Sequence, residues 1–228
     1  MHYLGIPGTR ALSLVLSGEQ VERDVMYDGN PAWEPGAIVC RVAPSFIRFG
    51  SFEIHASRND IQTLRTLADY CIQHDFADMD FDLTSPTVYL DWFNEVCQRT
   101  LAMIVHWQRV GFVHGVMNTD NMSILGLTID YGPYGWLDDF DPSWTPNTTD
   151  LPGRRYAFAN QPKIAHWNLV KLAQALLPLV GDASGLEYIL NEYPAQYQAR
   201  EQAMYAAKIG IEHKPEEHQI LLLSLIHI

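Results

Sequence analysis

The spacing of apolar residues changes near residue 58 from a period of two to a period of about 3.6, and this change constrains the fold most. Before it, apolar and polar residues alternate over 11–16, and another apolar run covers 37–42. Such alternation is typical of β-strands, so residues 10–56 are expected to be β-rich. Turn residues at 17–19 predict a hairpin of 11–16 with 21–25. The chain is therefore expected to begin with a small antiparallel sheet.

After this point the apolar residues recur at helical spacing. One amphipathic helix is predicted by Ile61, Leu64, Leu67 and Cys71. A longer helix of about 25 residues is expected to begin with Ser85 as N-cap and Pro86 at its first position, and to stop at Gly111. Further helices are expected at about 162–180, 184–192 and 195–209. The predicted fold class is α+β, a small sheet followed by a mostly helical body.

Composition narrows the function classes. The 228 residues suffice for one or two small domains, and 15 basic against 27 acidic side chains give a formal charge of −12. Such an acidic chain lacks the basic face of a bulk nucleic-acid binder. Its apolar stretches fall short of the roughly 18 residues of a membrane span.

The cysteines and the N-terminus point to one compartment. Cys40, Cys71 and Cys97 lie far apart and form no CxxC pair, so we expect them to be buried thiols in a reducing compartment. Residues 1–5 show neither a basic nor an apolar signal region. The predicted location is the cytoplasm.

Both ends of the sequence look cut, and we interpret the chain as a fragment. Residues 1–6 run directly into a turn at Pro7-Gly8. The apolar stretch 219–228 ends without a polar tail, although uncovered runs of this kind promote association. The last few residues are therefore candidates for a non-native end.

A compact polar segment at 114–141 concentrates the residues capable of chemistry. His114 and Asn121 are seven residues apart, as in the kinase catalytic loop H-R-D-x-x-x-x-N. A β-like run over 123–129 then leads to Asp130-Tyr131-Gly132, where a kinase has D-F-G. In kinase-like lobes this Asn and this Asp reach Mg²⁺ on the nucleotide phosphates. The segment therefore predicts a nucleotide and metal site, with His114 holding the loop by hydrogen bonds.

One position departs from the kinase pattern. Val116 stands where the catalytic Asp belongs, and valine cannot accept the proton of a substrate hydroxyl. A carboxylate is present instead at Asp120, next to Asn121. The alternative interpretation is that Asp120 and Asn121 cap a turn and that Asp130 only ends a strand.

Eight motifs resemble the selenoprotein O (SelO) family of pseudokinases over about residues 1–210. They are LGIP (4–7), TRAL (9–12), RVAPS (41–45), IRFGSF (47–52), HGVMNTDNMS (114–123), TIDYGP (128–133), DDFDP (138–142) and GRRY (153–156). The resemblance implies a protein-kinase-like fold. Residues 1–56 would be a partial small lobe with a remnant of an antiparallel sheet, and 57–228 the helical catalytic lobe.

The resemblance also implies an activity. Proteins of this family bind ATP in an inverted orientation and transfer AMP to Ser, Thr or Tyr hydroxyls of proteins. By resemblance Asp120 is the general base, Asn121 and Asp130 hold Mg²⁺ (or Mn²⁺), and Arg41 and Arg48 contact the phosphates. Two guanidiniums seven residues apart on one strand–turn unit can converge on a polyphosphate. Their alternative role is that of surface arginines in ordinary ion pairs.

Two other functions stay open. Small-molecule phosphotransferases of the aminoglycoside-kinase type also combine His-Gly, a later Asn and Ile-Asp-aromatic, but they need Asp where this chain has Val116. A non-catalytic, nucleotide-binding pseudokinase is the other. The family's Gly-rich segment, its lysine and the glutamate paired with it are expected upstream of residue 1. The fragment alone is therefore predicted to be weak or inactive.

Overall fold

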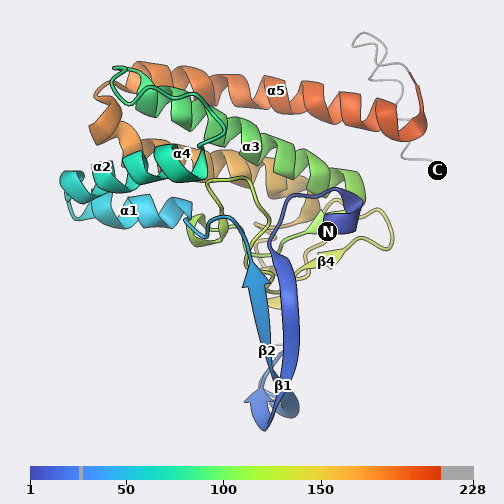
Figure 1. The fold of residues 1–228 in the computed structure, drawn as a ribbon. Coiled ribbons are helices and arrows are strands. Elements are labelled where there is room, and N and C mark those ends of the chain that lie inside the picture. Colours follow the sequence, from blue (N-terminus) through green and yellow to red (C-terminus); the bar gives the residue numbers. More distant parts are fainter. Residues whose placement is uncertain (26–27, 212–228) are drawn as a thin grey trace.

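The computed structural model describes residues 1–25 and 28–211. Their fold is α+β, with small antiparallel sheets and a mostly helical body (Figure 1). The strands are β1 (Arg10–Arg23), β2 (Ala32–Val42), β3 (Phe112–Val113) and β4 (Gly135–Trp136). The α-helices are α1 (Phe49–Ser57), α2 (Ile61–Tyr70), α3 (Val88–Val110), α4 (Gln161–Val180) and α5 (Ala183–Ile209). The short 3₁₀-helices are η1 (His2–Leu4), η3 (Thr119–Asn121), η4 (Thr148–Asp150) and η5 (Phe158–Asn160), and η2 (Cys71–Asp75) is a short π-helix that continues α2.

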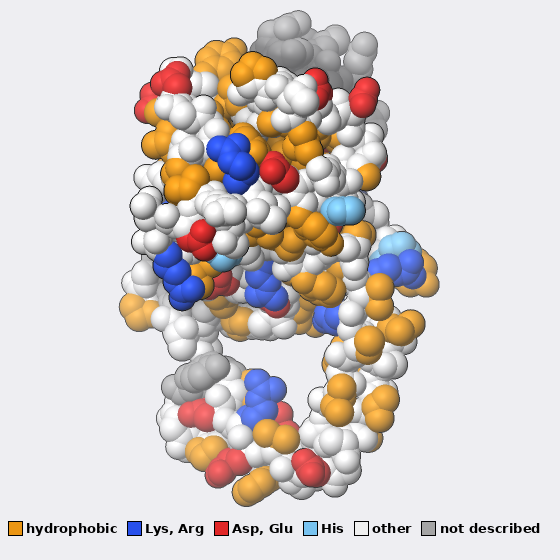
Figure 2. Space-filling model, turned by 60° about the vertical axis from the view of Figure 1, so that its left-hand side comes forward, with side chains coloured by type: hydrophobic (Ala, Val, Ile, Leu, Met, Phe, Trp, Pro, Cys, Tyr) orange, Lys and Arg blue, Asp and Glu red, His pale blue; other side chains and the backbone are white. Residues whose placement is uncertain are grey.

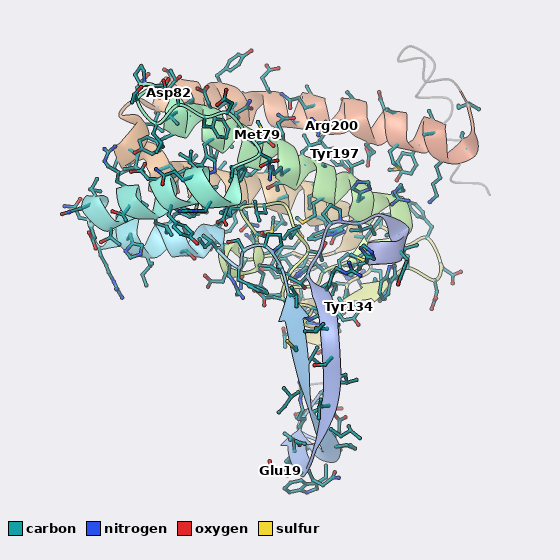
Figure 3. All side chains as sticks on the ribbon, in the orientation of Figure 1. Glu19, Met79, Asp82, Tyr134, Tyr197 and Arg200 are labelled. Carbon is teal, nitrogen blue, oxygen red and sulfur yellow. The ribbon has the colours of Figure 1, made fainter. Side chains whose placement is uncertain are left out.

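Strands β1 and β2 form a long antiparallel ribbon that projects from the helical body (Figure 1). Its register runs from Arg10 opposite Val42 to Arg23 opposite Ala32, with an irregularity between Leu16 and Gln20. Both strands are exposed along nearly their whole length. Figure 2 shows apolar side chains scattered over the ribbon, and Figure 3 places Glu19 at its far end.

The hairpin predicted between 11–16 and 21–25 is wrong, because residues 11–16 and 21–23 both lie on β1 and pair with β2. Gly18, with φ of +81°, marks the irregularity within β1 instead of a chain reversal. At the end of β1 the Asp24 carboxylate accepts hydrogen bonds from the backbone N–H groups of Asp28 and Gly29. The strand expected at 37–42 is confirmed as part of β2.

Residues 49–56 were expected to extend the β-rich region, and this prediction is also wrong, because α1 begins at Phe49. Phe49 and Phe52 are three residues apart and fully buried, so they lie on one side of a helix. That side packs where α1 meets α2 and α4. The burial of two phenylalanines in the main core explains why this short segment is helical.

Helix α3 lies at the centre of the body, between α4 and α5. It ends at Gly111 with φ of +69°, as predicted, but begins at Val88, three residues after the predicted N-cap Ser85. Trp92 and Trp107 on this helix are almost completely buried. The helices predicted near 61–71 and at 162–180 are confirmed as α2 and α4.

Helix α5 corrects the prediction of two helices at 184–192 and 195–209. It is continuous from Ala183 to Ile209 although Pro194 lies inside it. A proline within a helix removes a hydrogen bond and costs about 3 kcal/mol. Buried Tyr193 stacks on His166 of α4, and Leu190 is buried one turn earlier, so packing holds the helix together across the proline.

The strand expected over 123–129 is absent from the described structure, and isolated bridges hold this segment instead. Ser123 bridges to Arg48, and Thr128 bridges to Gly8. The Phe49 N–H donates to the Met122 carbonyl at 3.0 Å, and the Thr9 N–H donates to the Thr128 carbonyl at 3.0 Å. The segment that precedes β1 and the segment that follows β2 thus both bond the polar segment and hold it in place.

The cysteines and the membrane prediction can also be compared with the structure. Cys71 and Cys97 are buried as expected, but Cys40 on β2 is exposed, because the ribbon has no covering layer among the described residues. Within the same residues, none of the helices combines the length and apolar character needed to cross a bilayer.

Candidate active site

His114 anchors the start of the polar segment from inside the body. It is fully buried, and its ring lies on Trp107 with centroids 5.4 Å apart. Its Nε2 donates to the Ile129 carbonyl at 2.7 Å, and its backbone N–H donates to Oε1 of Gln161 at 3.0 Å. Burial lowers the pKa of His114, and the hydrogen bond to Ile129 offsets part of that effect. The prediction that His114 holds the loop by hydrogen bonds is confirmed.

Asn121 is fixed by its amide nitrogen. Its Nδ2 donates to the Val116 carbonyl at 2.8 Å. Among the described residues its Oδ1 has no hydrogen-bond partner, so this oxygen is available to a ligand. Val116 thus supports Asn121 through its backbone, although its side chain cannot serve as a base.

Asp120 is exposed on η3 and points toward the first turn of α1. A Cβ placed on Gly50 would lie only 2.0 Å from Oδ1 of Asp120, so the carboxylate rests where a larger residue would have its side chain. None of the described residues forms a hydrogen bond or ion pair with this carboxylate. A carboxylate in this position is free to accept a proton from a hydroxyl brought close to it.

Arg48 joins the two acidic positions of the segment. Its Nη1 lies 2.6 Å from Oδ2 of Asp130, and its Nη2 donates to Oδ1 of the same carboxylate at 3.1 Å. The Nη1 atom also donates to the backbone carbonyl of Asp120 at 2.8 Å. Both side chains of the ion pair are about one-third exposed, at 33% and 34%. A pair this exposed adds little to the free energy of folding, so its main effect is to position the groups.

Asp130 also has an unusual backbone conformation. Its φ is +51°, in the left-handed region that non-glycine residues seldom adopt. The neighbouring Ile129 is buried and accepts the hydrogen bond from His114. The body therefore fixes the chain just before Asp130 and turns its carboxylate toward Arg48.

Arg41 reaches the next residue along the chain. Its guanidinium lies 4.5 Å from the centre of the Tyr131 ring, and its Nη1 donates to Oγ1 of Thr9 at 3.3 Å. Burial raises the pKa of Tyr131, although nearby Arg41 lowers it in part. Arg41 and Arg48 therefore contact adjacent residues, Tyr131 and Asp130.

The structure thus brings together Arg48, the Asp120 backbone and Asp130, with Arg41 beside them. It does not link the Asp120 carboxylate or the Asn121 side chain to Asp130 directly. No cluster of three or more His, Cys, Asp or Glu side chains suited to a metal is present in the described chain. Asn121 and Asp130 supply oxygen donors only, and oxygen is what a hard cation such as Mg²⁺ prefers.

The comparison with protein families decides where this arrangement belongs. The family described as "Protein adenylyltransferase SelO" matches residues 1–228, which is the whole chain. The chain belongs to the SelO family.

Curated relatives of this SelO chain carry a consistent name. A protein of Xanthomonas campestris pv. campestris (strain B100), named "Protein nucleotidyltransferase YdiU", is 58% identical over 225 residues, which cover 99% of this chain and 43% of the relative. A protein of the same name from Rhodopirellula baltica (strain DSM 10527 / NCIMB 13988 / SH1) is 58% identical over 231 residues, again 99% of this chain and 43% of the relative. The chain therefore spans less than half the length of these relatives.

Some features of this SelO site were missed by sequence reasoning. Gly50 falls in the region predicted to be β-rich, so its contact with Asp120 was not foreseen, and neither were the contacts of Arg41 with Tyr131 and Thr9. These residues lie inside the motifs that resemble the SelO family, and those motifs were the signal that could have pointed to them. The contacts join segments that are distant in the sequence, and local patterns do not reveal such contacts.

Proposed function

We propose that the chain carries the base and the metal ligands of a protein adenylyltransferase, which transfers AMP from ATP to Ser, Thr or Tyr hydroxyls of proteins. Membership of the SelO family and the name of its relatives support the reaction class. The observation that carries the proposal is Arg48, which bonds both the Asp130 carboxylate and the Asp120 backbone. Arg48, the predicted phosphate-binding cation, therefore contacts a predicted metal ligand and the backbone of the predicted base, whose own carboxylate lies against Gly50.

A kinase-like arrangement is part of the proposal. Residues 1–56 would belong to a small lobe and 57–228 to the helical lobe, with the segment 114–141 at their junction. The order of ribbon, long central helix and bridged polar segment supports this assignment.

Mg²⁺ or Mn²⁺ would be held by Asn121 and Asp130. The fit rests on the donors, because Asn121 is anchored through Nδ2 and keeps its Oδ1 free, while Asp130 is a carboxylate one-third exposed to solvent. When bound, the ion neutralises charge on the phosphates. Only two protein ligands are needed, since Mg²⁺ commonly keeps waters and phosphate oxygens as its other ligands.

The two arginines would bind the phosphates of ATP. In this structure both terminal nitrogens of Arg48 bond the Asp130 carboxylate, and Arg48 would exchange that carboxylate for phosphate oxygens, which suit the same fork. Arg41 is held on the face of Tyr131, which limits its rotation and places a second positive charge nearby. Together they would stabilise the negative charge of the departing pyrophosphate.

Asp120 would act as the general base. The acceptor oxygen forms a bond to the α-phosphorus while the bond from that phosphorus to the bridging oxygen of pyrophosphate breaks. The acceptor's proton passes to the free carboxylate of Asp120, and pyrophosphate leaves with the electron pair. General-base catalysis of this kind contributes about 10²–10⁴-fold.

We also propose a cytoplasmic location. Cys40, Cys71 and Cys97 are all free thiols in the described structure, which suits a reducing compartment. ATP and hydroxyl-bearing proteins, the proposed partners, are both available there.

The reaction can be tested with ATP labelled on either the α- or the γ-phosphate. Because the chain spans 43% of its relatives, the assay uses a chimaera, which is the Xanthomonas campestris relative with its matching 225 residues replaced by this chain. We expect label on acceptor protein from α-labelled ATP alone, and a loss of about 10²–10⁴-fold with Asp120→Asn. The 228-residue chain alone is expected to be weak or inactive.

The possible outcomes separate the three functions. Label transferred only from the γ-phosphate would reject AMP transfer and favour the small-molecule phosphotransferase. Nucleotide binding without transfer of either label, unchanged by Asp120→Asn, would favour the non-catalytic pseudokinase. Glu187→Gln, on the exposed surface of α5, is the control that should leave transfer unchanged.

A further inference from the structure

A hollow of about 610 Å³ opens beside the proposed base, on the side of α1. Its lining residues are Gly50, Ser51, Glu53, Ile54, Ser57, Thr119 and Asp120. Four of them, at positions 50, 53, 54 and 57, follow the spacing of one helix face. The opposite face of α1 carries buried Phe49 and Phe52, so the hollow uses the face that the core leaves free.

The charges of this hollow differ from those around Asp130. Its walls carry two carboxylates, on Glu53 and Asp120, and none of the described residues that line it is Lys or Arg. In the described part of the chain, neither carboxylate has a hydrogen-bond or ion-pair partner. Arg41 and Arg48 contact Tyr131 and Asp130 instead. A polyphosphate would be repelled from the hollow and attracted to the arginines.

We propose that this hollow binds the acceptor segment of the protein substrate, and that Glu53 selects segments with Lys or Arg beside the hydroxyl to be modified. The inference rests on the proposed function, because it gives the Asp120 carboxylate a hydroxyl to deprotonate. Asp120 separates the two sides of the site, with its backbone bonded to Arg48 and its carboxylate resting on Gly50. An acceptor that enters along α1 therefore meets the base before it meets the phosphates.

Side chains around Glu53 define the rest of the expected acceptor. Ile54 is 43% exposed and offers an apolar surface one residue further along the helix. The hydroxyl of Thr119 has no hydrogen-bond partner among the described residues and can bond the acceptor backbone. The net charge of −12 adds long-range attraction for a basic segment.

Binding of short peptides to the 228-residue chain tests the inference without any need for transfer. The probe is a fluorescent Ser-containing peptide with Arg on either side of the hydroxyl, compared with the same peptide carrying Glu at those positions. We expect tighter binding of the Arg peptide, a loss of about threefold to fivefold with Glu53→Gln, and a reversed preference with Glu53→Lys. Glu187→Gln, at a similarly unpaired acid away from the hollow, should leave binding of both peptides unchanged.

The outcomes keep the two proposals apart. If Glu53→Lys leaves the preference for the Arg peptide unchanged, or if wild type binds both peptides equally, the acceptor site is rejected even where the chimaera transfers α-label. If Glu53 governs peptide binding while the chimaera transfers no α-label, the binding site stands and the transfer reaction is rejected. Circular dichroism of each variant confirms that the fold is retained.

Discussion

The ribbon and the helical body are similarly apolar in sequence but differ in what covers their side chains. On the ribbon Leu12 is 73% exposed and Trp33 is 67% exposed, whereas Trp92 in the body is fully buried. A two-stranded ribbon without a covering layer is only marginally stable by itself. The body therefore fixes the geometry of the site, while the ribbon and its exit contribute the cations.

The site lies where these two regions meet. His114 and Asn121 are held by hydrogen bonds from within the helical body and its loops. Arg41 belongs to β2, and Arg48 precedes α1 six residues after β2 ends. Arg41 therefore comes from the exposed ribbon, whereas Arg48 and the acidic residues belong to the packed body and its loops. Substitutions in the two regions should have different effects.

The largest expected difference is in stability. Trp92→Ala should lower the free energy of unfolding by about 3–5 kcal/mol, because it opens a cavity in the core. Trp33→Ala, the same substitution on the ribbon, should change it by no more than about 0.5 kcal/mol. Urea unfolding of both variants measures the contrast. Similar losses for the two would contradict the view that the other described residues leave the ribbon uncovered.

A smaller effect is expected at the junction, and it concerns activity. Gly50→Ala places a Cβ against Oδ1 of Asp120 and should displace the proposed base, with a loss of AMP transfer of about 10–100-fold. Gly153→Ala is the matched control, since a Cβ there meets nothing within 4 Å. Transfer assays in the chimaera and urea unfolding of the chain separate catalysis from stability. Equal activity of the two variants would mean that the position of Asp120 does not matter.

The smallest expected effect is a dependence of the free energy of unfolding on pH, which arises from two histidines of the helical body. Burial lowers the pKa values of His106 and His114, so the unfolded chain takes up protons near pH 6.5 that the folded chain resists. The free energy of unfolding should therefore be highest above pH 6.5 and should fall as the pH drops below it. The fall is at most about 1.4 kcal/mol per pH unit for each histidine. Urea unfolding at pH 7.5, 6.5 and 5.5 measures this slope.

Variants identify the source of that slope. His114→Gln should reduce it, whereas the same substitution at exposed His74 should leave it unchanged. Because residues 10–42 contain no histidine, hydrogen exchange of ribbon amides should show no matching loss of protection at low pH beyond that of global unfolding. An unchanged slope in His114→Gln would show that this buried ring does not set the pH dependence.

The sequence predicts some regions of the molecule better than others. The periodic helices α2, α3 and α4 were predicted because their apolar residues recur locally, and the role of His114 in holding the loop was predicted from its place in the motif. Helix α1, the continuity of α5 and the bridges at 123–129 were missed, because each depends on packing between distant segments. The roles of Asp120, Asn121, Asp130, Arg41 and Arg48 stay predictions. The contact between Gly50 and Asp120 could not be predicted, since it joins two elements seventy residues apart.

The most direct test of the central claim is binding of Mn²⁺ with ATP to the 228-residue chain, followed by electron paramagnetic resonance. Wild type should bind the ion in an ATP-dependent manner, and Asp130→Asn should weaken binding by at least about tenfold, because it removes a charged oxygen ligand. Asp138→Asn, in the acidic stretch a few residues further along the chain, should leave binding unchanged. Equal affinity of wild type and Asp130→Asn would contradict the claim that this segment holds the metal for AMP transfer.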